Sequence, residues 1–350
     1  MAALKRFGLP AGILELIESI YTDRRFQVSS SDGTSQWKAQ SSGISQGCPL
    51  SPFLFVMLMT VIMEDAIGLL GPADRRHYED GSLAVVLYAD DTLLIGDSAK
   101  SLHRLLQAVA TVGGRYGLLL HSDKFQLTQT RTAERVIDHW GNAISVKECM
   151  LYLGTHIASS GSVIREVGQR IGAAWSVFKD LQALWKHTQV PRRRKIEVYQ
   201  AIVTSRLLYG LSSAWINVAE LRRLDGFQSR CLRKILGIQP AYYSRVPNRK
   251  ILEIAQQLPY SRQLLKQQLL LFGKVARAPD SDPLRQLTFC ASSLHAATGK
   301  YVRRVGRPRN EWALKLRTQA ERAAGSSANL EVCLADPAIW SATVSRFIKE

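Results

Sequence analysis

Two adjacent aspartates, Asp90 and Asp91, lie between two short apolar runs, and this pattern constrains the fold more than any other feature of the chain. Residues 83–87 read Leu-Ala-Val-Val-Leu and residues 92–95 read Thr-Leu-Leu-Ile. Strand-like runs joined by a tight turn predict a β-hairpin. Two carboxylates at its tip repel one another unless a cation such as Mg²⁺ neutralises them. An Asp-rich turn that only satisfies its own backbone is the structural alternative.

A glycine-rich loop and an apolar segment precede the aspartates. Residues 42–52 read Ser-Gly-Ile-Ser-Gln-Gly-Cys-Pro-Leu-Ser-Pro, and residues 53–62 are almost wholly apolar. Pro52 suits the first turn of a helix, so we expect a buried helix directly after the loop. Glycine lets the loop backbone and the side chain of Gln46 approach a flat substrate closely.

Together these segments resemble a reverse transcriptase of the non-LTR retrotransposon and group II intron branch. The loop from Gly43 resembles motif B, and Tyr88-Ala-Asp-Asp-Thr92 resembles motif C, the catalytic hairpin of the palm. The resemblance implies RNA-directed DNA polymerase activity, with dNTP, an RNA template and a DNA primer or target as partners. It implies that Asp90 and Asp91 are catalytic ligands of Mg²⁺ or Mn²⁺. Residues implied to contact dNTP or template–primer are Gly43, Gln46, Gly47, Pro49 and Tyr88.

The resemblance continues downstream of the aspartates. Residues 98–117 carry a helical apolar stripe at Leu102, Leu105, Leu106, Val109 and Val112. Residues 117–124 then resemble motif D, which implies that Lys124 lies near the nucleotide phosphates, although a solvated surface lysine is the simpler interpretation. Residues 151–155 resemble motif E, the primer-grip hairpin, which implies contacts from Leu153 and Gly154 to the primer.

Motif A has no counterpart in these 350 residues. It should be an apolar strand ending in Asp, and we expect none of Asp23, Asp32 and Asp65 to replace it, because Asp23 and Asp65 follow helices and Asp32 is a turn residue. Residues 9–21 read as a helix with Ile13, Leu16, Ile17 and Ile20 on one face, and residues 25–39 as a hairpin closed by a 29–33 loop. We therefore expect the C-terminal part of a larger polymerase, inactive alone, whose partner is an N-terminal palm and fingers segment.

Positive charge is concentrated in the second half of the chain. The net charge is +17; residues 1–160 hold 14 basic and 16 acidic residues, and residues 161–350 hold 32 basic and 13 acidic residues. Such asymmetry indicates a polyanionic partner, first of all nucleic acid. Apolar periodicity predicts helices in this half, including residues 164–184, 196–207 and 221–236.

By position, this helical half resembles the thumb that follows the primer grip. We expect an α+β chain with a partial right-hand polymerase palm (motifs B to E) over residues 1–157, a helical thumb-like nucleic-acid-binding domain over 161–290, and a loosely held basic tail over 291–350 with a helix near 311–323. Trp175, Trp185 and Trp215 are expected in the core rather than as base-stacking platforms. The residues predicted to contact the nucleic-acid backbone are Arg192, Arg193, Arg194 and Lys195 of the thumb, and Arg303, Arg304, Arg307 and Arg309 of an AT-hook-like stretch, for which a plain basic linker is the alternative.

Cysteine usage and hydropathy add weaker constraints. The five cysteines, at positions 48, 149, 231, 290 and 333, show no zinc-type spacing, which favours reduced thiols in an intracellular protein of the nucleus, the cytoplasm or both. The apolar run 52–63 is too short to span a bilayer, so no membrane partner is expected.

Three functions are compatible with these observations. The first is an RNA-directed DNA polymerase or its C-terminal part, and the second is a non-catalytic nucleic-acid-binding remnant of a retroelement polyprotein. The third, a scaffold in which the motifs are coincidental, is disfavoured because motifs B to E occur in order.

Overall fold

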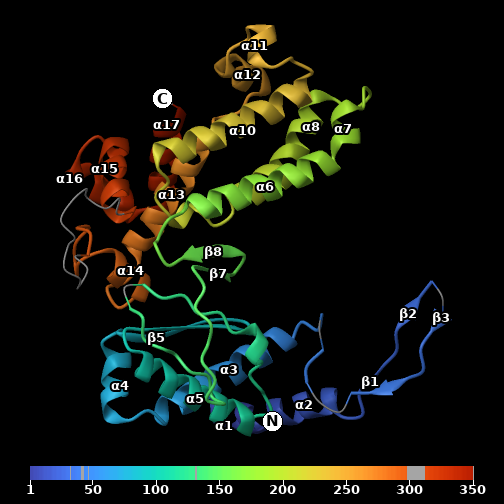
Figure 1. The fold of residues 1–350 in the computed structure, drawn as a ribbon, viewed down its shortest axis with the longest axis vertical. Helices are drawn as coiled ribbons and strands as arrows, with labels where there is room; N and C mark the ends of the chain where they lie inside the picture. The colour runs from blue at the N-terminus through green and yellow to red at the C-terminus, as the bar shows by residue number, and fades with distance from the viewer. Residues whose placement is uncertain (32, 41–42, 46, 131, 298–311, 350) are drawn as a thin grey trace. The chain divides into compact units, whose positions relative to one another are not determined.

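A computed structural model describes the chain except for residues 32, 41–42, 46, 131, 298–311 and 350 (Figure 1). The chain divides into two compact units, Met1–Gly154 (unit 1) and Thr155–Glu350 (unit 2). The described residues form mainly helices and small two-stranded sheets, in agreement with an α+β chain.

The elements of unit 1 position the predicted motifs along one helical scaffold. They are α1 (Ala2–Phe7), α2 (Ala11–Tyr21), β1 (Arg25–Phe26), β2 (Ser29–Ser30), β3 (Gly33–Thr34), β4 (Lys38–Ala39), α3 (Ser51–Gly68), α4 (Pro72–Glu79), β5 (Leu83–Tyr88), β6 (Asp91–Gly96), α5 (Ala99–Arg115), the 3-10 turn η1 (Ser122–Lys124) and β7 (Cys149–Tyr152). Strand β1 pairs with β4, β2 with β3, and β5 with β6, all antiparallel. The hairpin predicted over 25–39 is confirmed, but Ser29, Ser30 and Gly33, expected in its loop, form part of the strand pair β2–β3.

The core of unit 1 lies between α3, α5 and the hairpin β5–β6. The predicted stripe on α5 is confirmed, since Leu105, Val109 and Val112 are at most 6% exposed. They pack with Ile62 and Ala66 of α3, and burying each large aliphatic side chain contributes about 1.5–3 kcal/mol. Helix α5 begins where the Ser98 hydroxyl accepts a hydrogen bond from the Ser101 amide.

Helix α3 begins with Pro52 in its first turn, as predicted, but it is not buried throughout. Phe53 and Val56 are 65% and 58% exposed, because the first half of α3 is covered on one side only, where Leu54 packs with Leu4 of α1. The helix also runs to Gly68. Its 18 residues have a mean hydropathy of 1.5, which by length and composition alone is enough to cross a membrane, and 33% of them are buried. The argument that this segment is too short is therefore wrong.

Helix α2 turns a different face inward from the one predicted. Leu14 and Ile17 are buried, but Ile13, Leu16 and Ile20 are 43–60% exposed. The helix covers Leu54 of α3 with one narrow edge, so most of its apolar side chains lie on an open surface.

Unit 2 begins with a strand and is otherwise helical among its described residues. Its elements are β8 (Thr155–Ala158), α6 (Ile164–Asp180), α7 (Gln182–Lys186), α8 (Arg192–Val198), the π-helical turn η2 (Tyr199–Thr204), α9 (Ser205–Leu208), η3 (Leu211–Ser213), α10 (Val218–Leu236), α11 (Ala241–Ser244), α12 (Asn248–Ala255), α13 (Tyr260–Arg277), α14 (Pro283–Thr288), α15 (Trp312–Ala324), α16 (Ser327–Ala335) and α17 (Pro337–Lys349). The three helices predicted from periodicity are thus present. Helix α10 starts where the Asn217 side chain accepts from the Glu220 amide and ends at Gly237, whose φ of 71° is left-handed.

Two hydrophobic cores stabilise unit 2. The first core packs α6, the π-turn and α10 around Tyr199 and Leu224. The second core packs α13 against α15, α16 and α17 around Phe272 and Trp340. Trp185 lies in the first core, and Trp175 packs against this core. Trp215 packs against the second core. The prediction that these tryptophans are core residues is therefore confirmed.

The second core corrects the expectation of a loose tail. The predicted helix near 311–323 exists as α15, but residues 312–349 are packed helices rather than an extended basic segment. Trp340 is 1% exposed, and its Nε1 donates to the Leu269 carbonyl at 2.8 Å. The C-terminal helices therefore belong to the same folded unit as α13.

Candidate functional site

The two predicted catalytic aspartates lie at the tip of the β5–β6 hairpin. Tyr88 pairs with Asp91, so only Ala89 and Asp90 form the turn. Ala89 has φ 51°, a left-handed conformation that costs a non-glycine residue roughly 1–3 kcal/mol. Two-residue hairpin loops require such positive φ values. The predicted hairpin is confirmed, with Asp90 in the turn and Asp91 at the first position of β6.

The hairpin tip is open to solvent. Both aspartates are exposed, and Tyr88, Leu87 and Val86 are 63%, 38% and 43% exposed. Among the described residues, β5 and β6 pair only with each other. Each strand therefore keeps an outer edge of unpaired backbone groups, which is a template for another strand.

The charge of Asp91 acts on Tyr152 of β7. Burial, and then the negative charge of Asp91, raise the pKa of the Tyr152 phenol above its usual value. Its hydroxyl oxygen is buried and has no hydrogen-bond partner in the described structure. Unit 1 thus brings β7, which carries the motif E-like sequence, toward the aspartate turn. Sequence reasoning missed Tyr152, because Tyr-Leu-Gly is an ordinary pattern for a core strand.

The motif B-like loop adopts a conformation that needs its glycines. Gly43 and Gly47 have φ values of 78° and 82°, and an added Cβ would meet no atom within 4 Å, so backbone conformation rather than space selects glycine. The Ser51 hydroxyl donates to the Ser45 carbonyl at 2.7 Å and ties the loop to the start of α3. Pro49 is exposed, and Gln46 lies outside the described residues.

The remaining motif residues of unit 1 are accessible. Lys124 ends the η1 turn with an exposed side chain, which forms no ion pair with Asp90 or Asp91 within the described structure. Leu153 and Gly154 form the two-residue turn after β7, with φ values of 48° and 70°. A turn with two positive φ values is the type that joins hairpin strands with the natural twist.

The carboxylates present supply only part of a metal site. Asp90 and Asp91 offer the oxygen donors that Mg²⁺ or Mn²⁺ prefers. Throughout the described ranges, however, no three His, Cys, Asp or Glu side chains gather as a metal-binding group. The donor chemistry fits a divalent cation, whereas the number of donors falls short of a complete site.

Asp65, considered above as a substitute for motif A, has a structural role. The sequence predicted that Asp65 follows a helix, but it lies within α3. Its carboxylate accepts from Arg6 Nε at 2.8 Å and from the Tyr116 hydroxyl at 3.0 Å. The hydrogen bond from Arg6 lowers the pKa of Asp65. This carboxylate therefore holds α1 and α5 against α3.

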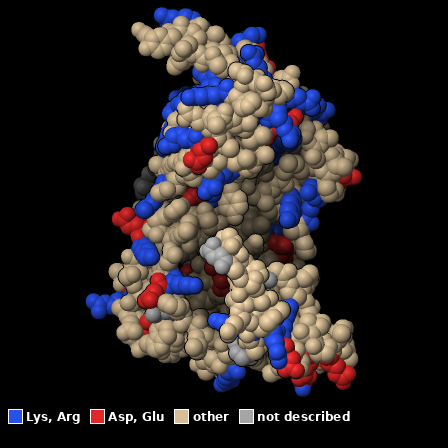
Figure 2. Space-filling model, turned by 90° about the vertical axis from the view of Figure 1, so that its right-hand side faces the viewer, with Lys and Arg blue, Asp and Glu red and all other residues tan. Residues whose placement is uncertain are grey.

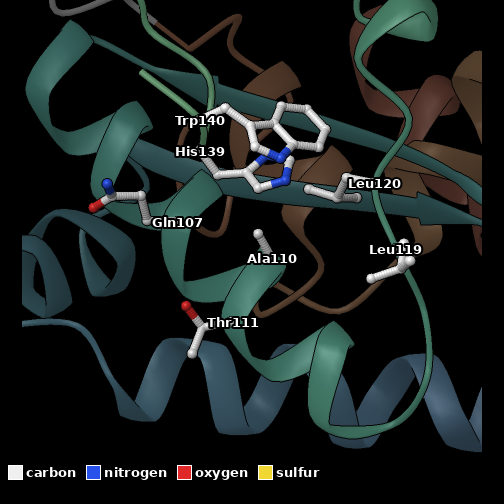
Figure 3. Close-up of a pocket in the computed structure, with 7 residues that line it drawn as sticks. All are labelled: Gln107, Ala110, Thr111, Leu119, Leu120, His139 and Trp140. Atoms are coloured by element: carbon white, nitrogen blue, oxygen red, sulfur yellow. The ribbon is translucent and has the colours of Figure 1, made fainter. Parts of the chain in front are cut away.

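A hollow in unit 1 lies against α5, and none of the predicted site residues line it. Figure 3 shows the rings of His139 and Trp140 over Ala110, with Leu119 and Leu120 at the side. The two ring centroids are 3.4 Å apart. The lining carries one imidazole and no carboxylate, so it offers nothing that resembles a metal or phosphate site.

In unit 2, the four-residue basic cluster at the start of α8 is split by burial. Arg192, Arg193 and Arg194 are exposed, and the latter two share the Glu197 carboxylate at 3.1 and 3.0 Å. Lys195 is 7% exposed, and its Nζ donates to the Trp185 carbonyl at 2.8 Å. The position of Lys195 does not suit the predicted phosphate contact, because its ammonium points into the first core.

Unit 2 also carries many basic side chains outside this cluster. Residues 161–350 hold 32 basic and 13 acidic residues, and Lys and Arg side chains are spread over much of the surface seen in Figure 2. The predicted contacts Arg303, Arg304, Arg307 and Arg309 lie outside the described residues.

The predicted motifs lie within a segment that is similar to known proteins. Residues 1–157 match the family model of reverse transcriptase (RNA-dependent DNA polymerase). The chain is 24% identical over 163 residues to a transposon-derived protein of Caenorhabditis elegans, which covers 45% of this chain and 58% of that protein.

Two Pol polyproteins of retrotransposable elements are also similar. The polyprotein from the type-2 element R2DM of Drosophila melanogaster is 21% identical over 247 residues, covering 67% of this chain and 22% of the polyprotein. That from the type-1 element R2 of Popillia japonica is 24% identical over 255 residues, covering 67% of this chain and 39% of the polyprotein. The matched segments thus span less than two thirds of each relative.

The likeness continues past residue 157 into unit 2, because the two polyprotein matches cover more of the chain than the family model does. The hairpin with its paired aspartates lies inside the family match, and the basic helical unit follows it. Residues 1–157 thus match the reverse transcriptase family, and the chain is similar to Pol polyproteins of retrotransposable elements.

Proposed function

We propose that this chain provides the motif B to E part of an RNA-directed DNA polymerase of a retrotransposon. The reaction is nucleotidyl transfer from dNTP to a primer 3′-hydroxyl on an RNA template, with DNA as primer or target. The observation that carries this proposal is the exposed Asp90–Asp91 turn of β5–β6, which lies inside the match to the reverse transcriptase family model.

In the proposed reaction, the two aspartates act at the metal and the other motif residues position the substrates. Asp90, in the turn itself, is the direct metal ligand, and Asp91 shapes the charge beside Tyr152. Reverse transcriptases generally use divalent metal ions, and Mg²⁺ or Mn²⁺ at this position would activate the primer hydroxyl and neutralise the leaving pyrophosphate. Phosphoryl transfer otherwise needs positioning, for which the proposed contacts are Gly43, Gln46, Gly47, Pro49, Tyr88, Lys124, Leu153 and Gly154.

We propose that a third carboxylate comes from a partner segment, because no three metal-ligating side chains gather among the described residues. The two free edges of β5–β6 and the exposed Val86 and Leu87 support the addition of another strand there. The open apolar face of α2 supports a further contact. We propose that the partner is a palm and fingers segment of the same polyprotein that carries motif A.

Primer extension on an RNA template tests this proposal. Residues 1–350 alone should give no extension, whereas a polypeptide that joins them to a motif A-bearing segment of the same element should extend the primer. In that active form, Asp90→Ala should abolish extension and leave duplex binding nearly unchanged.

Asp97→Asn, at the opposite end of β6, is the matched control and should remain active. Extension that survives Asp90→Ala would refute the site assignment. Extension by the 350-residue chain alone that is abolished by Asp90→Ala would refute the need for a further carboxylate.

A non-catalytic nucleic-acid-binding protein is the second candidate, favoured by the incomplete metal donor set and by the charge of residues 161–350. It predicts binding without extension even after motif A is supplied. In both cases the chain should bind duplex with steep salt dependence, because counterion release supplies the free energy. Replacing Arg192, Arg193 and Arg194 by Gln should reduce the slope of log K against log salt by up to about 2–3. An unchanged slope would exclude these arginines as phosphate contacts.

The proposed location follows from the proposed substrates. RNA templates and chromosomal targets place the protein inside the cell, in the nucleus, the cytoplasm or both.

A further inference from the structure

Two adjacent tyrosines are exposed on the short helix α11 of unit 2. Tyr242 and Tyr243 are 75% and 73% exposed, and their ring centroids lie 5.3 Å apart with the planes at 86°. Figure 1 shows α11 and α12 beyond the end of α10, with α11 outermost. Adjacent aromatic rings that are exposed to this degree form a candidate binding surface.

A buried arginine fixes the segment that carries these rings. Arg233 of α10 is 6% exposed, and its guanidinium donates to Gln239 O, Ser244 Oγ, Val246 O and Asn248 Oδ1 at 2.5–3.2 Å. The acceptors lie on both sides of the tyrosines, so one side chain holds the whole segment. A rigid aromatic surface loses little conformational entropy when it binds.

The surroundings of the tyrosines are cationic. The Arg245 guanidinium lies 5.5 Å from the centre of the Tyr242 ring. Arg249 and Lys250 of α12 are exposed and share a single carboxylate, Glu253, at 3.3 and 3.2 Å. Residues 226–279 contain ten Lys and Arg but only one acidic residue, Glu253. A partner for this surface should therefore combine negative charge with flat apolar rings.

Unpaired nucleotides have this combination of properties. In duplex the bases are stacked on one another, whereas in a single strand their faces are free to stack on aromatic side chains. Each such stack contributes about 1–3 kcal/mol and tolerates any base. A protein partner would instead need a broader apolar patch than two rings among arginines and lysines.

We propose that Tyr242 and Tyr243 form a base-stacking platform for single-stranded nucleic acid, with Arg245, Arg249 and Lys250 on its phosphates. The proposal rests on the nucleic-acid binding assigned above and adds a second kind of contact, to unpaired bases rather than to a duplex backbone. Such a platform suits the strand that leaves or enters a template–primer duplex.

A comparison of intact and abasic strands separates base contacts from phosphate contacts. Fluorescence anisotropy would measure binding of the 350-residue chain to a labelled single-stranded oligonucleotide and to one of equal length whose central nucleotides are abasic. The wild-type chain should prefer the intact strand by about thirtyfold, the lower end for two stacked bases at about 1 kcal/mol each. Tyr242→Ala/Tyr243→Ala should bind both strands equally, with the affinity of the wild type for the abasic strand.

Two matched variants complete the test. Tyr242→Phe/Tyr243→Phe keeps the rings and should keep the preference of about thirtyfold. Arg245→Gln/Arg249→Gln/Lys250→Gln should weaken binding of both strands by the same factor. These side chains are exposed, so thermal unfolding of the variants should match the wild type.

The possible failures of the proposal and of the assigned function differ. A wild-type chain that binds both strands equally, or alanine variants that lose affinity equally for both strands, would overturn the platform while nucleic-acid binding stands. A chain that binds neither strand would overturn the platform, and a chain that also fails to bind duplex would overturn the nucleic-acid-binding part of the proposed function. Primer extension, measured separately, reports on catalysis alone.

Discussion

Gly273 of α13 faces the buried indole of Trp340, and its replacement by alanine tests the packing of the C-terminal helices. A Cβ at residue 273 would lie 2.2 Å from Trp340 Nε1 and 2.3 Å from its Cδ1, far inside contact distance. Trp340 is 1% exposed and bonded to the Leu269 carbonyl, so it has no free space to enter. Gly273→Ala should therefore strongly destabilise unit 2.

The size of the effect follows from three terms. Overpacking a core costs about 1–3 kcal/mol. Displacement of the indole breaks the hydrogen bond from Trp340 Nε1 to the Leu269 carbonyl. The buried Nε1–H is then an unsatisfied donor, which costs about 1–3 kcal/mol. Alanine stabilises a helix interior by about 1 kcal/mol relative to glycine, which offsets part of this cost. The expected net loss in the free energy of unfolding is about 3 kcal/mol.

Urea denaturation followed by tryptophan fluorescence and circular dichroism measures this loss. The matched control is Gly226→Ala in α10, where a Cβ meets no atom within 4 Å and where about 1 kcal/mol should be gained. Trp340→Phe removes the clashing nitrogen, so its cost should be smaller in the Gly273→Ala background than alone. If Gly273→Ala were as stable as Gly226→Ala, residues 337–349 would not pack on α13 and the second core would be wrong.

Three further predictions concern single side chains and one turn. Asp74 is 2% exposed, and the hydrogen bond from Arg104 is the main cause that lowers its pKa. The lowered pKa means that the ionised Asp74 stabilises the folded state. This stabilisation is complete above the unfolded pKa near 3.8 and is lost as the pH falls through the lower folded pKa. Asp74→Asn should thus cost about 2 kcal/mol at pH 7, moderated because Arg104 is half exposed, and urea titrations that show the same cost at pH 3 would contradict this. The backbone amide of Leu50 lowers the pKa of Cys48, whereas burial raises that of Cys231 to about 12; mass spectrometry after iodoacetamide treatment at pH 7.5 should find Cys48 alkylated and Cys231 protected, and equal labelling would refute this order. Ala89→Gly should raise the free energy of unfolding by about 1 kcal/mol by relieving a positive φ, and a loss measured in the same urea assay would show that the turn is not strained.

Local patterns in the sequence were sufficient for the elements that carry the motifs. The Asp90–Asp91 hairpin and the buried stripe on α5 follow from alternating and helical periodicity, because each pattern lies within one continuous segment. The left-handed glycines 43 and 47 likewise follow from a local backbone requirement. These features need no knowledge of which elements meet.

Features that depend on distant partners were not predictable. Lys195 reads like its arginine neighbours, and only the approach of the Trp185 carbonyl makes its position a buried one. Which face of α2 is buried depends on how α1 and α3 pack against it. Tyr152 is a candidate site residue only because the charge of Asp91 affects it, and the two residues are distant in sequence. The C-terminal helices looked like a tail because their partner is α13, far away in sequence.

Helix α13 contributes to both cores of unit 2, and this sharing has a consequence for cooperativity. Tyr260 and Leu264 lie in the first core, and Leu269, Phe272 and Val275 lie in the second. If either core opened, half of an 18-residue helix would lose its partners, and short unsupported helices are marginal in water. Opening one core therefore weakens the other. Amide hydrogens of α6 and α17 should exchange with solvent through one shared opening, with similar protection factors, rather than as two independent foldons.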